Sequence, residues 1–396
     1  MPYQECLSVR YHQQDDTYYC GAACAQMVLE SAGVGLIDQG TLDSTISIHN
    51  DIEGGWATAP DGLQWTMNDS KPGSIGLVAA ASEDAISRKI VWSIYNRKLP
   101  AVALINGKAH WIVVRGFEAS AAPTSSADVS YTITAFDINN PSPKLGSSPP
   151  PPHGTADTCG SGGEFGFADE HIAYAHWRSS YMTGVPTSSF WEGKFVAVCD
   201  PAPPPTLVGA HVLTSNPENG EQILTPERAR ALARAGLEAY GLFQREAWRK
   251  SLLKTNPGDP ILVQRLDRAD AFYYIVPMQV SRKAVPVLVC VDARFGSYLQ
   301  SARISDRGGS AFHGLNFDPN AAIETIVGQS ISFGPKGRQI VRKEAFALYP
   351  TLVWRPCRES MSPYIPFFMV TLGDRRVFIR VDGQLFTSLH FGDSGI

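Results

Sequence analysis

A cysteine at the start of an apolar stretch is the first residue of this chain that could do covalent chemistry. The letters after Cys20, GAACAQMVL, place small and apolar residues three and four apart, which is the spacing of a buried helix. Cys20 then stands at the helix N-terminus, where the positive end of the helix dipole lowers a thiol pKa and favours the thiolate. Gly21 leaves room beside the sulfur for a substrate backbone. Cys24, one turn further on, is expected to be a core residue.

A histidine and a carboxylate further along could complete a nucleophilic site. His110 begins the strand-like run HWIVVRGF, which a short turn, NGK, joins to PAVALI as a hairpin. The run YTITAFD places Asp137 at the end of a neighbouring strand. A carboxylate bonded to one imidazole nitrogen fixes the tautomer and leaves the other nitrogen to take the thiol proton. Asn139 is the alternative, because an amide oxygen can accept the same hydrogen bond.

A glutamine six residues before Cys20 could stabilise the oxyanion that forms when a thiolate attacks an amide. The Gln14 side-chain N–H and the backbone N–H of Cys20 are the expected donors. Gln13 could serve in principle, but the spacing favours Gln14. Trp56 and Trp65 could line a substrate groove, although aromatic residues in such loops more often simply pack.

These motifs together resemble a known family. Gln14-x5-Cys20-Gly21, the HWIVVRG strand and an Asp closing the next strand are similar to papain-like peptidases of the bacteriocin-processing, double-glycine type, over about residues 8–200. The resemblance implies that Gln14 forms the oxyanion hole, Cys20 is the nucleophile, His110 is the general base and acid, and Asp137 orients His110. The family usually has Pro directly after this Asp. Here three residues precede Pro141, which keeps Asn139 open as the orienting residue.

The rest of the chain predicts an α+β protein. Helices are expected at 21–31 and 83–95, and strands at 100–105, 110–116, 131–136 and 194–199. Two segments rich in Pro, Gly and Ser interrupt the pattern, at 139–163 and 200–209, and we place a domain boundary at the second. The length of 396 residues also exceeds what one hydrophobic core usually holds. We therefore expect a papain-like domain at 1–203, in which the helix bearing the cysteine packs on an antiparallel sheet.

Beyond the boundary the sequence repeats itself. The forty residues from Pro260 align without a gap to those from Pro350, and twelve positions are identical, which indicates an internal repeat. Each copy is preceded by a helix start, Thr225-Pro226 or Asp318-Pro319. We expect two α+β repeats, 204–309 and 310–396, each a helix followed by antiparallel strands. The endings VLVCVD and VFIRVD weakly resemble PepSY-type or cystatin-like domains.

Composition limits the classes of partner. A net charge of -4 and 18% charged residues give no reason to expect nucleic acid or an anionic membrane. The chain has no secretory signal pattern and no apolar run of about 18 residues, so a cytoplasmic address is expected, with export that needs no cleaved N-terminal signal as the alternative. Seven cysteines, an odd number spread over a long chain, favour reduced thiols. No metal or cofactor is expected, because His153, Cys159, His171 and His176 match no tetrahedral spacing.

The predicted function is therefore thiol-dependent hydrolysis of peptide bonds through a thioester on Cys20, with peptides or proteins as substrates. The C-terminal repeats are expected to regulate the site, by restraining it, or to bind a protein partner. Glutamine deamidases, transglutaminases and cell-wall amidases use the same order of Cys, His and Asp, so these reactions remain alternatives. A papain-like binding module without activity is the alternative from another class.

Overall fold

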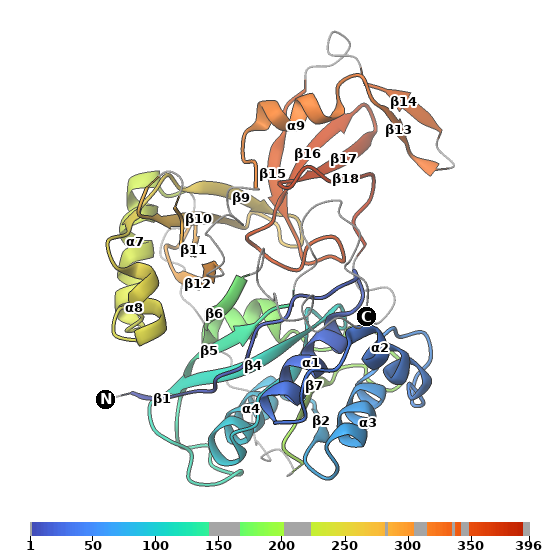
Figure 1. The fold of residues 1–396 in the computed structure, drawn as a ribbon. Helices are drawn as coiled ribbons and strands as arrows, with labels where there is room; N and C mark the ends of the chain where they lie inside the picture. The colour runs from blue at the N-terminus through green and yellow to red at the C-terminus, as the bar shows by residue number, and fades with distance from the viewer. Residues whose placement is uncertain are drawn as a thin grey trace.

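The structure is a computed structural model that describes residues 2–141, 167–201, 223–281, 284–304, 315–334, 337–341 and 348–390. It is an α+β protein built on one large sheet, which is antiparallel except for a single parallel pair among the described strands (Figure 1). In these ranges no helix is both long and apolar enough to cross a membrane. Most of the Pro-rich segment and most of the expected domain boundary lie outside the described residues.

The N-terminal part contains four well-formed helices and seven strands among its described residues. They are β1 (Tyr3–Cys6), α1 (Cys20–Ser31), α2 (Gln39–Ile48), α3 (Pro60–Ser70), β2 (Gly76–Ala80), α4 (Glu83–Arg97), β3 (Ala101–Ile105), β4 (His110–Ala119), β5 (Ile133–Asn139), β6 (Phe167–Ala173), two short turns α6 (Tyr174–His176) and η1 (Trp177–Tyr181), and β7 (Phe195–Cys199). The two helices and four strands expected here are confirmed to within a few residues at each end.

Alternation along β4 separates two cores on the two faces of the sheet. Trp111 and Val113 pack in one cluster with residues of α1, α2 and α3. Ile112 and Val114 point the other way, into a cluster with α4. Figure 1 shows α1, α2 and α3 grouped together beside β4 and β7. The sheet is therefore buried on both sides, and α1 presents its first turn at the end where β4 begins.

The expected hairpin before His110 is present. Strands β3 and β4 pair antiparallel, with Ile105 opposite His110. The turn passes through Asn106 and Gly107, both with positive φ (53° and 75°), a conformation that Asn and Gly adopt more readily than other residues. The turn therefore fixes His110 as the first residue of β4.

The C-terminal part contains α7 (Pro226–Ala239), α8 (Glu246–Leu252), β8 (Asn256–Pro257), β9 (Ile261–Arg265), β10 (Phe272–Gln279), β11 (Val287–Asp292), β12 (Tyr298–Ile304), α9 (Pro319–Ile326), β13 (Ser330–Ser332), β14 (Arg338–Ile340), β15 (Thr351–Trp354), β16 (Phe367–Leu372), β17 (Arg375–Arg380) and β18 (Leu385–Phe386). Helices α7 and α9 begin with the expected caps, where Thr225 and Asp318 accept hydrogen bonds from backbone N–H groups.

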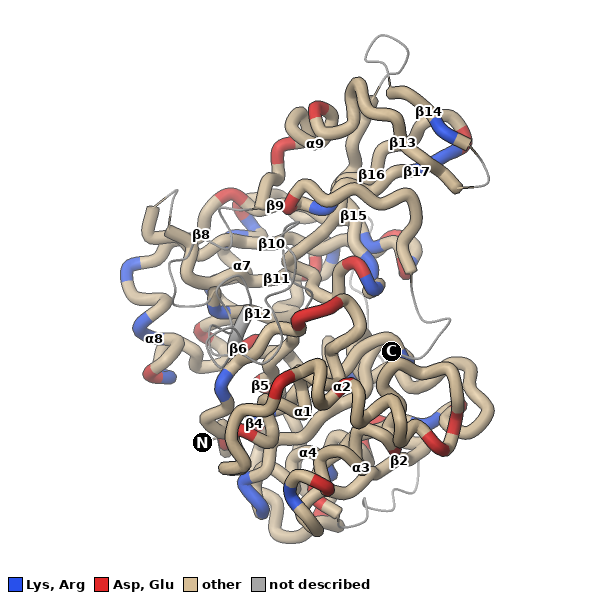
Figure 2. Tube along the Cα trace, turned by 45° about the vertical axis from the view of Figure 1, so that its right-hand side comes forward, with Lys and Arg blue, Asp and Glu red and all other residues tan. Residues whose placement is uncertain are grey.

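The two parts share the sheet, because β12 pairs antiparallel with β6 (Figure 1). Charged residues also cross this junction: Arg245 is paired with Asp137, and Arg303 with Asp169. Figure 2 shows basic and acidic residues interspersed along both parts of the chain. The C-terminal part is thus built directly onto the strands that follow the candidate site.

Gly21 has a packing role that differs from the one expected. A Cβ at this position would lie 2.2 Å from Thr58 Cγ2, so the first turn of α1 can pack on the loop before α3 only with glycine here. Trp111 Nε1 also donates to the Thr58 backbone oxygen, at 3.2 Å, which ties this loop to β4. The absence of a side chain at residue 21 therefore serves the contact of helix and loop.

We expect Gly21→Ala to lower the free energy of unfolding by about 1–3 kcal/mol, the usual cost of overpacking. Adding Thr58→Ala removes two of the three atoms that clash and should recover part of the loss. Gly54→Ala is the matched control, because a methyl group there meets nothing within 4 Å. Urea unfolding gives the free energy of unfolding of the wild type, of the two single variants and of the double variant. Equal stability of Gly21→Ala and Gly54→Ala would contradict this account of the packing.

Candidate active site

Cys20 is the first residue of α1 and is 1% exposed. Backbone N–H groups of Trp111, Gly21 and Cys20 itself face the thiol and favour its ionised form. Burial outweighs them and raises the thiol pKa to about 12. In this state of the protein the Cys20 thiol is therefore protonated at neutral pH.

His110, the first residue of β4, is equally buried and has one side-chain partner among the described residues. Its Nε2 lies 2.8 Å from Oδ1 of Asn140. Burial lowers the imidazole pKa to about 4, and the bond to Asn140 opposes this shift only in part. The ring is neutral at pH 7, so one of its nitrogens carries a proton and the other a lone pair.

The surroundings of Asn140 decide which nitrogen that is. Asn140 Nδ2 donates to the backbone oxygen of Met361, at 3.3 Å, and the Asn140 side chain also faces the carboxyl of Glu170. A backbone carbonyl can only accept, so the Asn140 N–H group turns to Met361, and Oδ1 is the atom that faces His110. Nε2 must then be the donor. Nδ1 of His110 is left with the lone pair that a general base needs.

Neither residue expected to orient His110 does so, which corrects the assignment of Asp137. Side chains alternate along β5, so Ile138 and Asn140 point to the face that carries Ile112 of β4 and the ring of His110. Asp137 and Asn139 point to the opposite face. The hydrogen-bond partner of His110 is Asn140, which directly precedes Pro141, and not Asp137.

Asp137 and Asn139 have structural contacts instead. Asp137 Oδ1 is 2.9 Å from His171 Nδ1, and Arg245 Nη1 donates to both Asp137 oxygens at 2.9 Å. Asn139 Nδ2 donates to the backbone oxygen of Val9, at 3.2 Å. These bonds fasten β5 to β6, to the loop before α8 and to the segment after β1.

Gln14 lies near the site, but its side chain points elsewhere. Its backbone N–H donates to Pro141, the neighbour of Asn140, at 3.3 Å. Its Nε2 donates to the backbone oxygen of Asp16, at 2.7 Å. No hydrogen bond joins Cys20 to His110 or to Gln14 in the described part of the chain. The structure thus gathers these residues at one end of the sheet without assembling a reacting set.

The remaining candidates have separate positions. Trp56 is buried in the same core cluster as Cys20, whereas Trp65 is 41% exposed and stacks on His49. Cys24 is fully buried and belongs to the core. His176 lies near Ser180, with Nδ1 3.2 Å from Oγ. His153 and Cys159, which with His171 and His176 match no tetrahedral spacing, lie outside the described residues.

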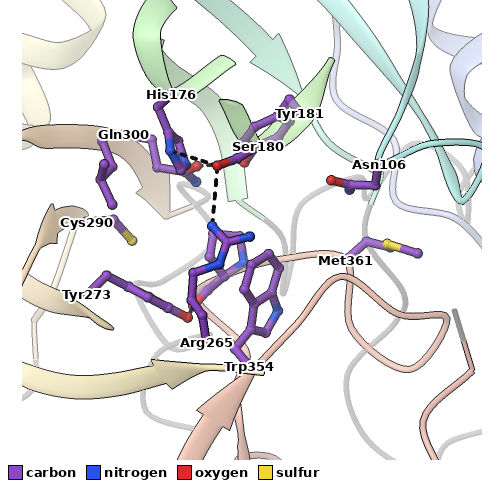
Figure 3. A pocket seen from close by; sticks show the side chains of 12 residues that line it. Asn106, His176, Ser180, Tyr181, Arg265, Tyr273, Cys290, Gln300, Trp354 and Met361 are labelled. Carbon is purple, nitrogen blue, oxygen red and sulfur yellow. Dashed lines mark hydrogen bonds between the residues drawn. The ribbon is translucent and has the colours of Figure 1, made fainter. Parts of the chain in front are cut away.

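The C-terminal part contacts the candidate site through Met361, whose backbone oxygen accepts from Asn140. Met361, from the loop between β15 and β16, is 3% exposed and packs in the core cluster that contains Cys20 and Trp111. Its loop is held in place where Tyr273 donates to the Pro363 backbone oxygen, at 2.7 Å. Figure 3 shows Met361 beside Asn106 at the edge of a small cavity between the two parts, with Arg265 and Ser180 joined across it. Among the described residues, Cys20 is thus almost fully buried.

Comparison with protein-family models, with curated proteins and with solved structures gave no match.

Sequence reasoning missed Asn140, Glu170 and Met361. One signal pointed to Asn140, since the family pattern puts Pro directly after the orienting residue and Asn140 is the residue before Pro141. Glu170 follows the long Pro-rich segment, in a strand with no regular apolar alternation. Met361 is distant in sequence, and nothing local indicates that it reaches the site.

We expect Asp137→Asn to lower the free energy of unfolding by about 3 kcal/mol, because it breaks a buried ion pair with Arg245. The rate of Cys20 alkylation should stay the same, since Asp137 does not contact His110. Asp259→Asn is the control, because its pair with Arg230 is on the surface and should change stability by less than about 1 kcal/mol. Urea unfolding and mass spectrometry of alkylated peptides provide the two readouts. If Asp137→Asn left stability unchanged but altered the rate of Cys20 alkylation, Asp137 would be a residue of the site after all.

Proposed function

We propose that this protein is a cysteine-dependent amide hydrolase that acts on peptides or proteins, with Cys20 as nucleophile, His110 as base and Asn140 as the orienting residue. The observation that supports this most is the bond from His110 Nε2 to Asn140 Oδ1, at the end of the sheet where α1 begins with Cys20. A histidine held in this tautomer has its basic nitrogen free. The fold that this implies for 1–203 is papain-like.

In the proposed reaction, His110 Nδ1 takes the proton from Cys20, and the thiolate attacks the amide carbon. The backbone N–H of Cys20 and the side chain of Gln14, once it leaves Asp16, would donate to the oxyanion. His110 then protonates the leaving amine. The thioester is hydrolysed by water that His110 deprotonates, which restores the thiol. Hydrogen bonds of this kind often tighten only when substrate is bound.

The C-terminal part is proposed to keep the enzyme latent. Met361 packs in the core cluster of Cys20, and its backbone oxygen accepts a bond from Asn140. The burial that follows keeps both reacting groups neutral. In this proposal 204–309 and 310–396 are two related α+β units, and a partner that draws the second unit away would expose the thiol. All six cysteines that the structure describes are free thiols, which suits a cytoplasmic setting.

Removing the cover should activate the thiol. Met361→Ala takes away a buried side chain, which usually costs about 2–5 kcal/mol. If about 2 kcal/mol of this cost favours the open state, the exposed fraction of Cys20 rises about 30-fold. We expect a similar rise in the rate of Cys20 alkylation by iodoacetamide at pH 7. Met278→Ala, which truncates a fully buried methionine of another cluster, should leave that rate unchanged. Equal rates in the two variants would contradict the role of Met361 as a cover.

The reaction itself is tested with Met361→Ala and a defined mixture of peptides, followed by mass spectrometry. Hydrolysis gives cut peptides, deamidation adds about one mass unit, and transglutamination gives a cross-link. The products therefore distinguish a peptidase from the other enzymes that form a thioester. Met361→Ala combined with Cys20→Ser should give no product. A protein whose exposed Cys20 alkylates readily but yields no product would be a binding module instead, a reading favoured by the high thiol pKa of the closed state.

A further inference from the structure

Glu170 is a buried acid that the proposed reaction does not use. It lies on β6, with no exposed surface. In the sheet, Glu170 is opposite Ile138 of β5. On the other side of β6, Ile172 is opposite Gln300 of β12. Because side chains alternate, three polar side chains lie on one face of the sheet: Glu170 on β6, Gln300 on β12 and Asn140 directly after β5. Their positions are diagonal neighbours on adjacent strands.

These side chains form a connected polar series, in which hydrogen bonds join Tyr181 to Gln300, Gln300 to Glu170 and Asn140 to His110. Gln300 Nε2 donates to Glu170 Oε2, at 3.0 Å. The Asn140 side chain faces the same carboxyl, whose other oxygen, Oε1, has no hydrogen-bond partner among the described residues. Tyr181 donates to Gln300 Oε1, at 2.7 Å, so the Gln300 amide can only turn its N–H groups toward Glu170. The series runs from Tyr181 through Gln300, Glu170 and Asn140 to His110.

The chemical state of Glu170 fits this role. Burial raises its carboxyl pKa to about 8, more than the two amide donors lower it. The group is therefore mostly neutral at pH 7, so one oxygen carries the proton, the other accepts, and no full charge lies near His110. Its bonds go to amides and not to His110 or Cys20, so it acts only through Asn140.

We propose that Glu170 is a positioning residue that fixes the Asn140 amide, and through it the Nε2–H tautomer of His110, and that Gln300 of the C-terminal part holds Glu170 in place. The C-terminal part then builds the site that it also covers. The importance of this tautomer for catalysis rests on the proposed function. The tautomer itself can be measured without any activity.

The test is the tautomer of His110 in the full chain, read from the nitrogen and carbon chemical shifts of labelled histidine at pH 7. Wild type should show Nε2–H. Glu170→Ala removes the acceptor, so Asn140 can turn its N–H groups toward His110, and the ratio of tautomers should shift toward Nδ1–H by about tenfold. Glu170→Gln keeps one carbonyl oxygen for the two amide donors and should retain Nε2–H.

Two further variants keep the test decisive. Glu83→Ala truncates another buried carboxyl, one that contacts Ser87 and Arg178, and should leave His110 unchanged. Gln300→Ala removes the other partner of Glu170. It should shift the ratio of His110 tautomers in the same direction as Glu170→Ala, but by a smaller factor. Signals of His12 and His171 report whether each variant has folded.

The outcomes separate the two proposals. If Glu170→Ala keeps the wild-type tautomer, or if Glu170→Gln shifts it as far as Glu170→Ala does, the positioning role is overturned. If the tautomers behave as expected but no exposed form of the protein hydrolyses an amide, the positioning role stands and the proposed function fails.

Discussion

The arrangement of the candidate site depends on one side chain, the amide of Asn140. Its oxygen accepts from His110, its nitrogen donates to the Met361 backbone oxygen, and its side chain faces Glu170. An amide has one acceptor atom and one donor atom, so the bonds to His110 and Met361 leave a single orientation. That orientation determines the tautomer of His110 and joins strands β4 and β5 to the C-terminal part.

The same burial that orders these groups also keeps them from reacting. Cys20 has three backbone N–H groups around its sulfur, an arrangement that would favour a thiolate in a wetter site. Removal from water has the larger effect, and it moves the pKa of the thiol up and that of the imidazole down. A substrate that displaces Met361 would bring its own polar groups to the thiol and remove part of this penalty. Exposure and activation are therefore one event in this account.

Local sequence was enough to predict the parts of the structure that local forces form. The helix at Cys20, the hairpin before His110 and the caps at Thr225 and Asp318 each depend on a few neighbouring residues. Asp137 does not contact His110, because alternation along β5 turns its side chain to the opposite face of the sheet. Met361 and Gln300 reach the site only through pairing of β6 with β12 and the path of a distant loop, and no local pattern contains that information.

The measurement that tests the central claim most directly is the pH dependence of Cys20 alkylation in Met361→Ala, with His110 intact and with His110→Ala. The account predicts that with His110 the exposed thiol reacts well below pH 8, because the imidazole takes its proton, and that without His110 the rate rises only near the ordinary thiol pKa of about 8.5. Identical profiles for the two proteins would show that Cys20 and His110 do not act together, and would contradict the account.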